Sequence, residues 1–169
     1  MADNIEFLEG GQRKKRLGTQ IYSTSTGNTT TGTLVSTGTT VRAVADFWRY
    51  GASLTPVQNL LAAAGASIYR STGDGLWSAV TGTSSWGLST NSQTVITLAG
   101  DYAVFSDETA DPIAYNQSTL VGPTTGGAWP RFTASAYHRD RLFMWGISTA
   151  PSRVAYTAAG NIFDSTGAD

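Results

Sequence analysis

The feature that most restricts the fold of this sequence is a series of short apolar runs. The runs are broken by Gly or Asp at about the 8–12-residue spacing of all-β proteins. NLLAAAGASIYRST divides at Gly65, and TVITLAGDYAVFSD divides at Gly100-Asp101. SAYHRDRLFMWGI divides at the polar triplet His138-Arg139-Asp140. Such runs are typical of antiparallel sandwiches, barrels and propellers. The pattern therefore predicts paired strands joined by tight turns.

The composition also favours strands. Charged residues make up 14% of the chain, against roughly 25% in an average soluble domain. Glycine, threonine and serine replace the missing lysine and glutamate, and β-branched residues suit a pleated surface. The absence of cysteine excludes disulfides and thiolate zinc sites. The fold class predicted is all-β, with one local alternative: TPVQNLLAAAGA can start a helix with Thr55 as N-cap and Pro56 at its first position.

Three segments share a plan of run, turn and second run with a tyrosine near its end. The tyrosines are Tyr69, Tyr115 and Tyr156, which are 46 and 41 residues apart. A period in the forties is the length of a four-stranded propeller blade. The repeat predicts about three antiparallel, propeller-like blades.

The stretch YRSTGDGLW resembles the Asp-box, a Ser-x-Asp-x-Gly-x-x-Trp hairpin of propeller folds. Gly73 stands where the box has its aspartate, and Asp74 comes one place late. Gly73 and Gly75 tolerate positive φ, and Asp74 can accept bonds from nearby backbone amides. We interpret the stretch as a structural turn between two strands and not as a catalytic loop.

No constellation of residues predicts catalysis. His138 is the single histidine, its acidic neighbour Asp140 is two residues away, and no Gly-x-Ser-x-Gly nucleophile turn accompanies them. Asp107, Glu108 and Asp111 offer carboxylates to a calcium ion, but their spacing matches no defined calcium loop. We expect no enzymatic activity, no catalytic residues, no metal and no cofactor.

Aromatic residues raise a binding alternative. Trp86 and Trp129 lie next to Gly- or Ser-rich loops and are candidate contacts for a glycan. A β protein of this size also needs large side chains between its sheets, so core packing is the competing interpretation.

The chain divides by texture into an arm, residues 1–40, and a blade region, residues 41–169. The arm holds the basic run Arg13, Lys14, Lys15 and Arg16, followed by a Thr/Ser/Gly-rich stretch. The net charge of −1 predicts neither a nucleic-acid binder nor a membrane-surface protein. No apolar run reaches the 18 or so residues of a membrane span, and the first residues lack the pattern of a secretory signal. We expect synthesis in a cytoplasm and no membrane span.

A resemblance to a known family rests on three stretches. GGQRKKRLGTQIY resembles the Arg-Lys-Arg-Pro-Gly-Thr opening of phage tail nozzle and related β-propeller tail proteins, with Leu17 in place of the proline. DYAVFSDETADPIAYN is similar to their strand, turn, Asp-Pro, strand, Tyr segment. HRDRLFMWGISTAPSRVAYTAAGNIFD is similar to their Arg-Leu-Phe, Ser-Arg-Val-x-Tyr-Ser and Gly-Asn blade.

The resemblance implies a non-enzymatic structural component of a bacteriophage tail or head–tail junction. It would be made in the host cytoplasm, reside in the virion tail and assemble as a ring through sheet edges and loops. The implied partners are copies of itself and other tail or portal-proximal proteins, with transient contact to genomic DNA. The basic run is expected mainly to contact carboxylates of a neighbouring subunit, with DNA as the alternative.

Three blades do not close a ring, because propellers have at least four. The sequence stops at NIFDSTGAD in mid-pattern, which favours a longer protein; copies that complete one another and sheets that stay open are the other options. The alternative function is a carbohydrate-binding propeller or tail-spike module. A sialidase-like enzyme comes third, because the single Asp-box-like turn has no arginine cluster in matching repeats.

Overall fold

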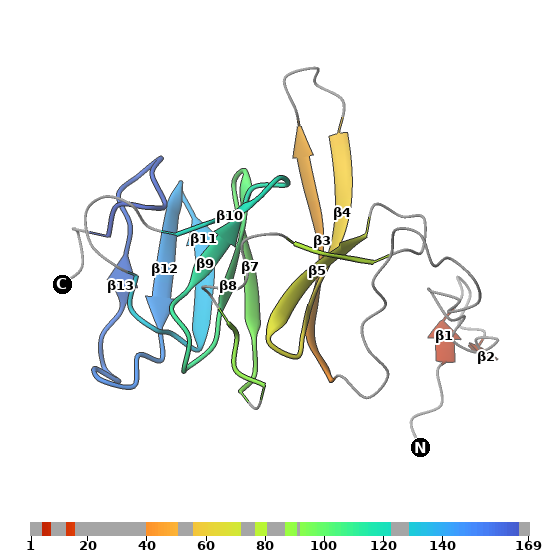
Figure 1. The fold of residues 1–169 in the computed structure, drawn as a ribbon, viewed down its shortest axis with the longest axis horizontal. Coiled ribbons are helices and arrows are strands. Elements are labelled where there is room, and N and C mark those ends of the chain that lie inside the picture. Colours follow the sequence, from red (N-terminus) through yellow and green to blue (C-terminus); the bar gives the residue numbers. More distant parts are fainter. Residues whose placement is uncertain are drawn as a thin grey trace.

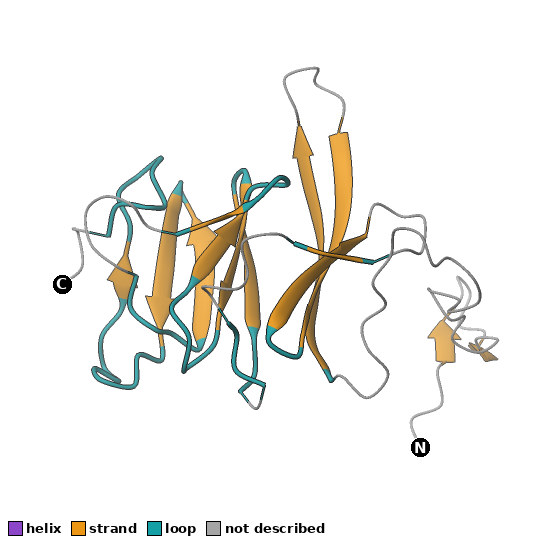
Figure 2. Cartoon of the chain, viewed as in Figure 1, coloured by secondary structure: helices purple, strands orange, loops and turns teal. Residues whose placement is uncertain are grey.

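The fold is all-β, with antiparallel sheets and no helix among the residues described (Figures 1 and 2). The computed structural model describes residues 5–7, 13–15, 40–50, 56–71, 77–80, 87–90, 92–122 and 129–165. The predicted fold class is confirmed at this level. No helix in this part of the chain is long and apolar enough to cross a membrane.

The strands form one two-stranded sheet and three larger ones, which we name the first, middle and last sheets. The small sheet pairs β1 (Ile5–Phe7) with β2 (Arg13–Lys15). The first sheet contains β3 (Val41–Tyr50), β4 (Pro56–Ala64), β5 (Ser67–Ser71) and β6 (Ser78–Ala79). The middle sheet contains β7 (Val95–Ala99), β8 (Tyr102–Ser106), β9 (Ile113–Tyr115) and β10 (Leu120–Val121). The last sheet contains β11 (Ala134–His138), β12 (Arg141–Trp145) and β13 (Ala155–Tyr156).

Each of the three larger sheets is an up-and-down meander in which every strand pairs with the next in sequence. The predicted hinges are the turns between paired strands. Gly65 and Gly100 have φ of 55° and 58°, while Arg139 and Asp140 have φ of 47° and 58°. The left-handed conformation is the reason that glycine and aspartate punctuate the runs.

The helix alternative at residues 55–66 is wrong, because residues 56–64 form β4. This strand pairs with β3 on one side and β5 on the other. Leu61 and Ala63 are buried and point to one face of the sheet, as a period of two requires. Two flanking strands outweigh the helix propensity of the alanine run.

The tyrosine repeat marks equivalent positions, since Tyr69, Tyr115 and Tyr156 all lie in the third strand of their sheets. The Asp-box-like turn connects β5 to β6, which pair antiparallel. Residues 72–76 themselves lie outside the described residues. The flanking pairs place the stretch in a β-hairpin connection.

The middle sheet is covered on both faces, and this organises the core. Ala103, Phe105 and Tyr115 pack with Phe47 and other residues of the first sheet. The opposite face of the middle sheet, through Ala99, Val104 and Ala114, packs with Leu142, Met144 and Ala155 of the last sheet, as well as with Trp129 and Phe132. The three sheets therefore stack as consecutive layers, and they follow one another along the long axis in Figure 1.

The first strands of the three sheets are neighbours, since β7 lies beside both β3 and β11. Thr97 of β7 and Ser135 of β11 are joined by a hydroxyl–hydroxyl hydrogen bond of 2.6 Å. None of the three sheets is closed on itself, and the described residues form no closed ring.

Candidate functional site

The basic run is partly described. Arg13, Lys14 and Lys15 form β2, in which Lys14 is the register partner of Glu6 in β1. Arg16 lies outside the described residues. The expected contacts of the run with a neighbouring subunit or with DNA remain predictions.

The two candidate glycan contacts fare differently. Trp129 is buried, and its indole Nε1 donates a 2.7 Å hydrogen bond to the Ile162 carbonyl. Its ring stacks on Phe163, with 5.4 Å between the centroids. The burial of Trp129 agrees with the core-packing interpretation and not with a surface contact, because its apolar ring and its one N–H donor are both used inside the fold. Trp86 lies outside the described residues.

Arginines join the first sheet to the middle sheet. Arg49 Nη1 donates to the Asn116 carbonyl at 2.7 Å, and Arg70 Nη1 donates to the Gln117 carbonyl at 2.9 Å and to the Tyr115 hydroxyl at 3.1 Å. Gln117 has φ of 76° in the turn between β9 and β10. Two cations from one sheet thus hold a strained turn of the next.

Burial raises the pKa of the Tyr115 phenol above its ordinary value, although Arg70 acts in the opposite direction. The hydroxyl also donates a 2.7 Å hydrogen bond to the Gln117 carbonyl. Tyr115 therefore serves as a neutral structural bridge between the sheets at ordinary pH.

A cavity of about 430 Å³ lies where the β7–β8 and β11–β12 turns meet the segment 160–163. Polar groups on its wall come from Asp101, Tyr137, Asp140 and Asn161. The Tyr137 hydroxyl donates to Asp140 Oδ1 at 3.3 Å. Burial, followed by the negative charges of Asp140 and Asp101, raises the pKa of Tyr137. Asp101 and Asp140 thus place two carboxylates on the wall of the cavity.

Contacts around the cavity also show in which direction the first strands of the three sheets run. Arg49, near the end of β3, lies 3.5 Å from Asp101, which follows the end of β7. Asp101 and Asp140, which follow the ends of β7 and β11, line the same cavity. The strands β3, β7 and β11 therefore end at one common end of the stack, which we name the turn end.

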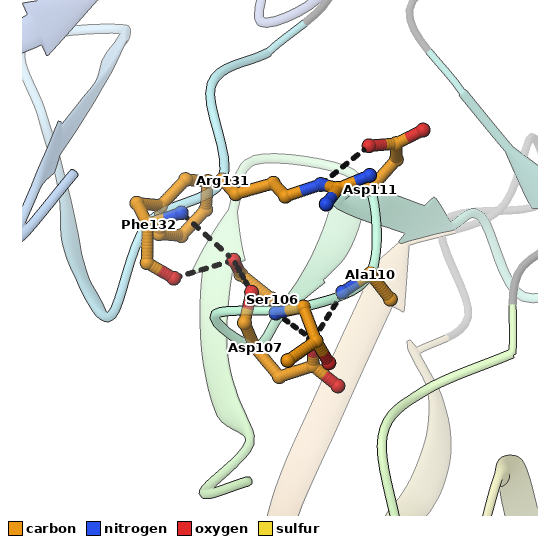
Figure 3. A network of polar contacts seen from close by, with 7 residues as sticks. Ser106, Asp107, Ala110, Asp111, Arg131 and Phe132 are labelled. Carbon is orange, nitrogen blue, oxygen red and sulfur yellow. Dashed lines mark hydrogen bonds and ion pairs between the residues drawn. The ribbon is translucent and has the colours of Figure 1, made fainter. Parts of the chain in front are cut away.

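Asp107 organises a loop between β8 and β9, and Figure 3 shows the surrounding network. Its Oδ1 accepts hydrogen bonds from the backbone N–H of Thr109 at 2.9 Å and of Ala110 at 2.6 Å, and from the Thr109 hydroxyl at 3.0 Å. Its Oδ2 accepts from the backbone N–H of Ser89 at 2.6 Å. Burial raises the pKa of this carboxyl, but the backbone N–H donors of Ala110, Ser89 and Thr109 together hold it below its ordinary value.

Neighbouring residues link this loop to the entry of the last sheet. The Ser106 hydroxyl donates to the Phe132 carbonyl at 2.6 Å, and Asp111 pairs with Arg131 at 2.9 Å (Figure 3). Asp107, weighed in the sequence as a calcium ligand with Glu108 and Asp111, is instead engaged by N–H and O–H donors. The described residues contain no group of three or more metal-ligating side chains.

Comparison of the chain with protein-family models, with curated proteins and with solved structures found no match.

The cavity at the turn end is the feature of the candidate site that the sequence did not predict. Asp101 and the hinge residue Asp140 carried a turn signal, which the structure bears out, but no signal placed them on one cavity. Arg49 and Arg70 lie 67 and 47 residues from the carbonyls that they bind. Only the stacking of the sheets brings such distant groups together.

Proposed function

We propose that the chain is a non-enzymatic structural component of a bacteriophage tail or head–tail junction. Its three meanders act as propeller-like blades, and it assembles with copies of itself in a ring through sheet edges and loops. Other tail or portal-proximal proteins are its further partners. It is made in the host cytoplasm and resides in the virion tail.

One observation carries the proposal: three consecutive meanders stack face to face with their first strands adjacent and ending together. Blades of a propeller are arranged in this way around a central axis. The resemblance of residues 10–22 and 41–164 to phage nozzle proteins agrees with such blades. Trp129 does not support the carbohydrate-binding alternative, because its ring is buried.

Immunoelectron microscopy of virions from the phage that encodes the chain tests the proposal. We expect label at the tail or at the head–tail junction, with none on particles treated with pre-immune serum. Label that is absent from intact and disrupted virions, with the protein detected only in the infected cell, would contradict a structural role.

The basic run gives a further prediction. Replacing Arg13, Lys14, Lys15 and Arg16 with serine removes four adjacent positive charges, so contacts with a neighbour's carboxylates weaken. We expect assembly to fall about tenfold or more at low salt and to lose most of its salt dependence, because exposed charges are screened within about 8 Å at physiological salt. Sedimentation velocity at several salt concentrations measures this, with Arg153→Ser as the single-charge control.

Normal assembly of the serine variant, together with altered DNA ejection from virions, would overturn the preference for subunit contact. It would assign the run to genomic DNA instead.

A further inference from the structure

The outer faces of the first and last sheets lie at opposite ends of the stack of three sheets. Side chains alternate between the faces of a strand, so one face of the first sheet packs on the middle sheet and the other points away from it. We name the second face the leading face; its β3 residues are Val44, Asp46 and Trp48. Val44 is 57% exposed and Trp48 is 50% exposed.

The last sheet has a matching outer face, which we name the trailing face. Leu142 and Met144 point to the middle sheet, while Arg141, Phe143 and Trp145 alternate with them and point away. Trp145 is 40% exposed. Phe143 and Tyr156 are register partners whose rings are 6.0 Å apart on this face. Exposed aromatic side chains of this kind mark interaction surfaces.

The two interfaces inside the chain show what these faces fit. The first sheet packs its inner face on the middle sheet, and the middle sheet packs its opposite face on the last sheet. Both contacts run in the same order along the stack. A contact between the trailing face of one copy and the leading face of the next would repeat the face-to-face packing of sheets seen twice within the chain.

The charges of the two faces are opposite. Asp46 is the charged residue among those of the leading face on β3 and accepts a 2.9 Å hydrogen bond from Gln58, the register partner of Trp48 on β4. On the trailing face the Arg141 guanidinium lies over the Tyr156 ring, 5.6 Å from its centroid, and donates to the Thr157 carbonyl at 3.0 Å. Opposite charges favour leading against trailing over two like faces together.

We propose that the trailing face of one copy binds the leading face of a second copy of this chain, head to tail. Two copies bring six of the larger sheets, within the range of four to eight blades for closed propellers. Two such contacts would close a dimer in which β3, β7 and β11 of both copies surround the axis. The inference rests on the proposed self-assembly and names the surfaces that carry it.

The test uses the full chain and the variants Trp48→Glu and Trp145→Glu. Each places a carboxylate on one face, and each variant alone can form only contacts with one damaged face. We expect the dimer dissociation constant of either variant to rise by about 30-fold or more, as for the loss of an aromatic anchor at an interface. Leu98→Glu is the matched control, because Leu98 is 43% exposed on a strand of the middle sheet and belongs to neither face. Circular dichroism checks that every variant is folded.

Mixing the two variants separates head-to-tail from symmetric association. Trp48→Glu keeps an intact trailing face and Trp145→Glu keeps an intact leading face, so the mixture regains one undamaged contact. We expect heterodimers in sedimentation velocity where each variant alone is monomeric.

Three results would overturn the proposal. A wild-type chain that is monomeric at all concentrations has no such contact. Dissociation by only one of the two substitutions, with no rescue on mixing, indicates a symmetric contact between like faces. Association that neither substitution alters places the contact elsewhere. These results are measured on the purified chain. The proposed function is tested separately, by the location of the protein in virions.

Discussion

Replacing Phe47 with alanine is expected to lower the free energy of unfolding by about 4 kcal/mol. Phe47 is 1% exposed, and its ring meets Tyr115 edge-on with 6.2 Å between the centroids. It joins the first sheet to the middle sheet, so its removal leaves a cavity between two layers. Urea unfolding followed by circular dichroism measures the loss.

Trp48 supplies a matched control for this experiment. It is the next residue in β3 but points to the opposite face, where half of its surface is exposed. Trp48→Ala is expected to change the stability of the monomer by under about 1 kcal/mol. A larger loss from Trp48→Ala than from Phe47→Ala would show that the two faces of the first sheet are assigned the wrong way round.

Replacing Asp107 with alanine is expected to cost about 3 kcal/mol of stability at neutral pH. The Asp107 side chain is fully buried. Its removal leaves the backbone N–H groups of Ser89, Thr109 and Ala110 without their acceptor, and each buried unpaired donor costs about 1–3 kcal/mol before the loop relaxes. Asp111→Ala is the control, because it breaks an exposed ion pair with Arg131 worth about 0–1 kcal/mol.

The contribution of Asp107 to the stability of the fold is expected to depend on pH. The pKa of Asp107 is lowered in the folded state, so the unfolded chain binds a proton more readily. Its stabilisation is therefore fully present above the ordinary aspartate pKa of about 3.9 and is lost as the pH falls through the folded-state pKa. Urea unfolding at pH 7 and below pH 4 should show a smaller difference between wild type and Asp107→Ala at the lower pH. An unchanged difference would show that the carboxylate charge does not matter to the loop.

Local features of the fold were predictable from the sequence. The hinges at Gly65 and Gly100 were legible because positive φ favours glycine, and the strands followed from alternation. The tyrosine repeat located the third strand of each sheet. The alanine run of β4 favoured a helix in the sequence, but the segment forms a strand. Its pairing with β3 and β5 is a tertiary effect that helix propensity does not include.

The relations between sheets were not predictable in the same way. Trp129 has the same chemistry on a surface as in a core, and only its bond to Ile162 decides between them. The carboxylates of Asp107 and Asp101 look alike in sequence. One closes a loop and the other lines a cavity, because their positions in the stack differ.

Electron cryo-microscopy of the assembled full chain tests the central claim most directly. We expect a closed ring in which the sheets are arranged radially and β3, β7 and β11 of every copy surround the axis. A particle in which these strands lie on the outside, or a dispersed monomer at all concentrations, would contradict it.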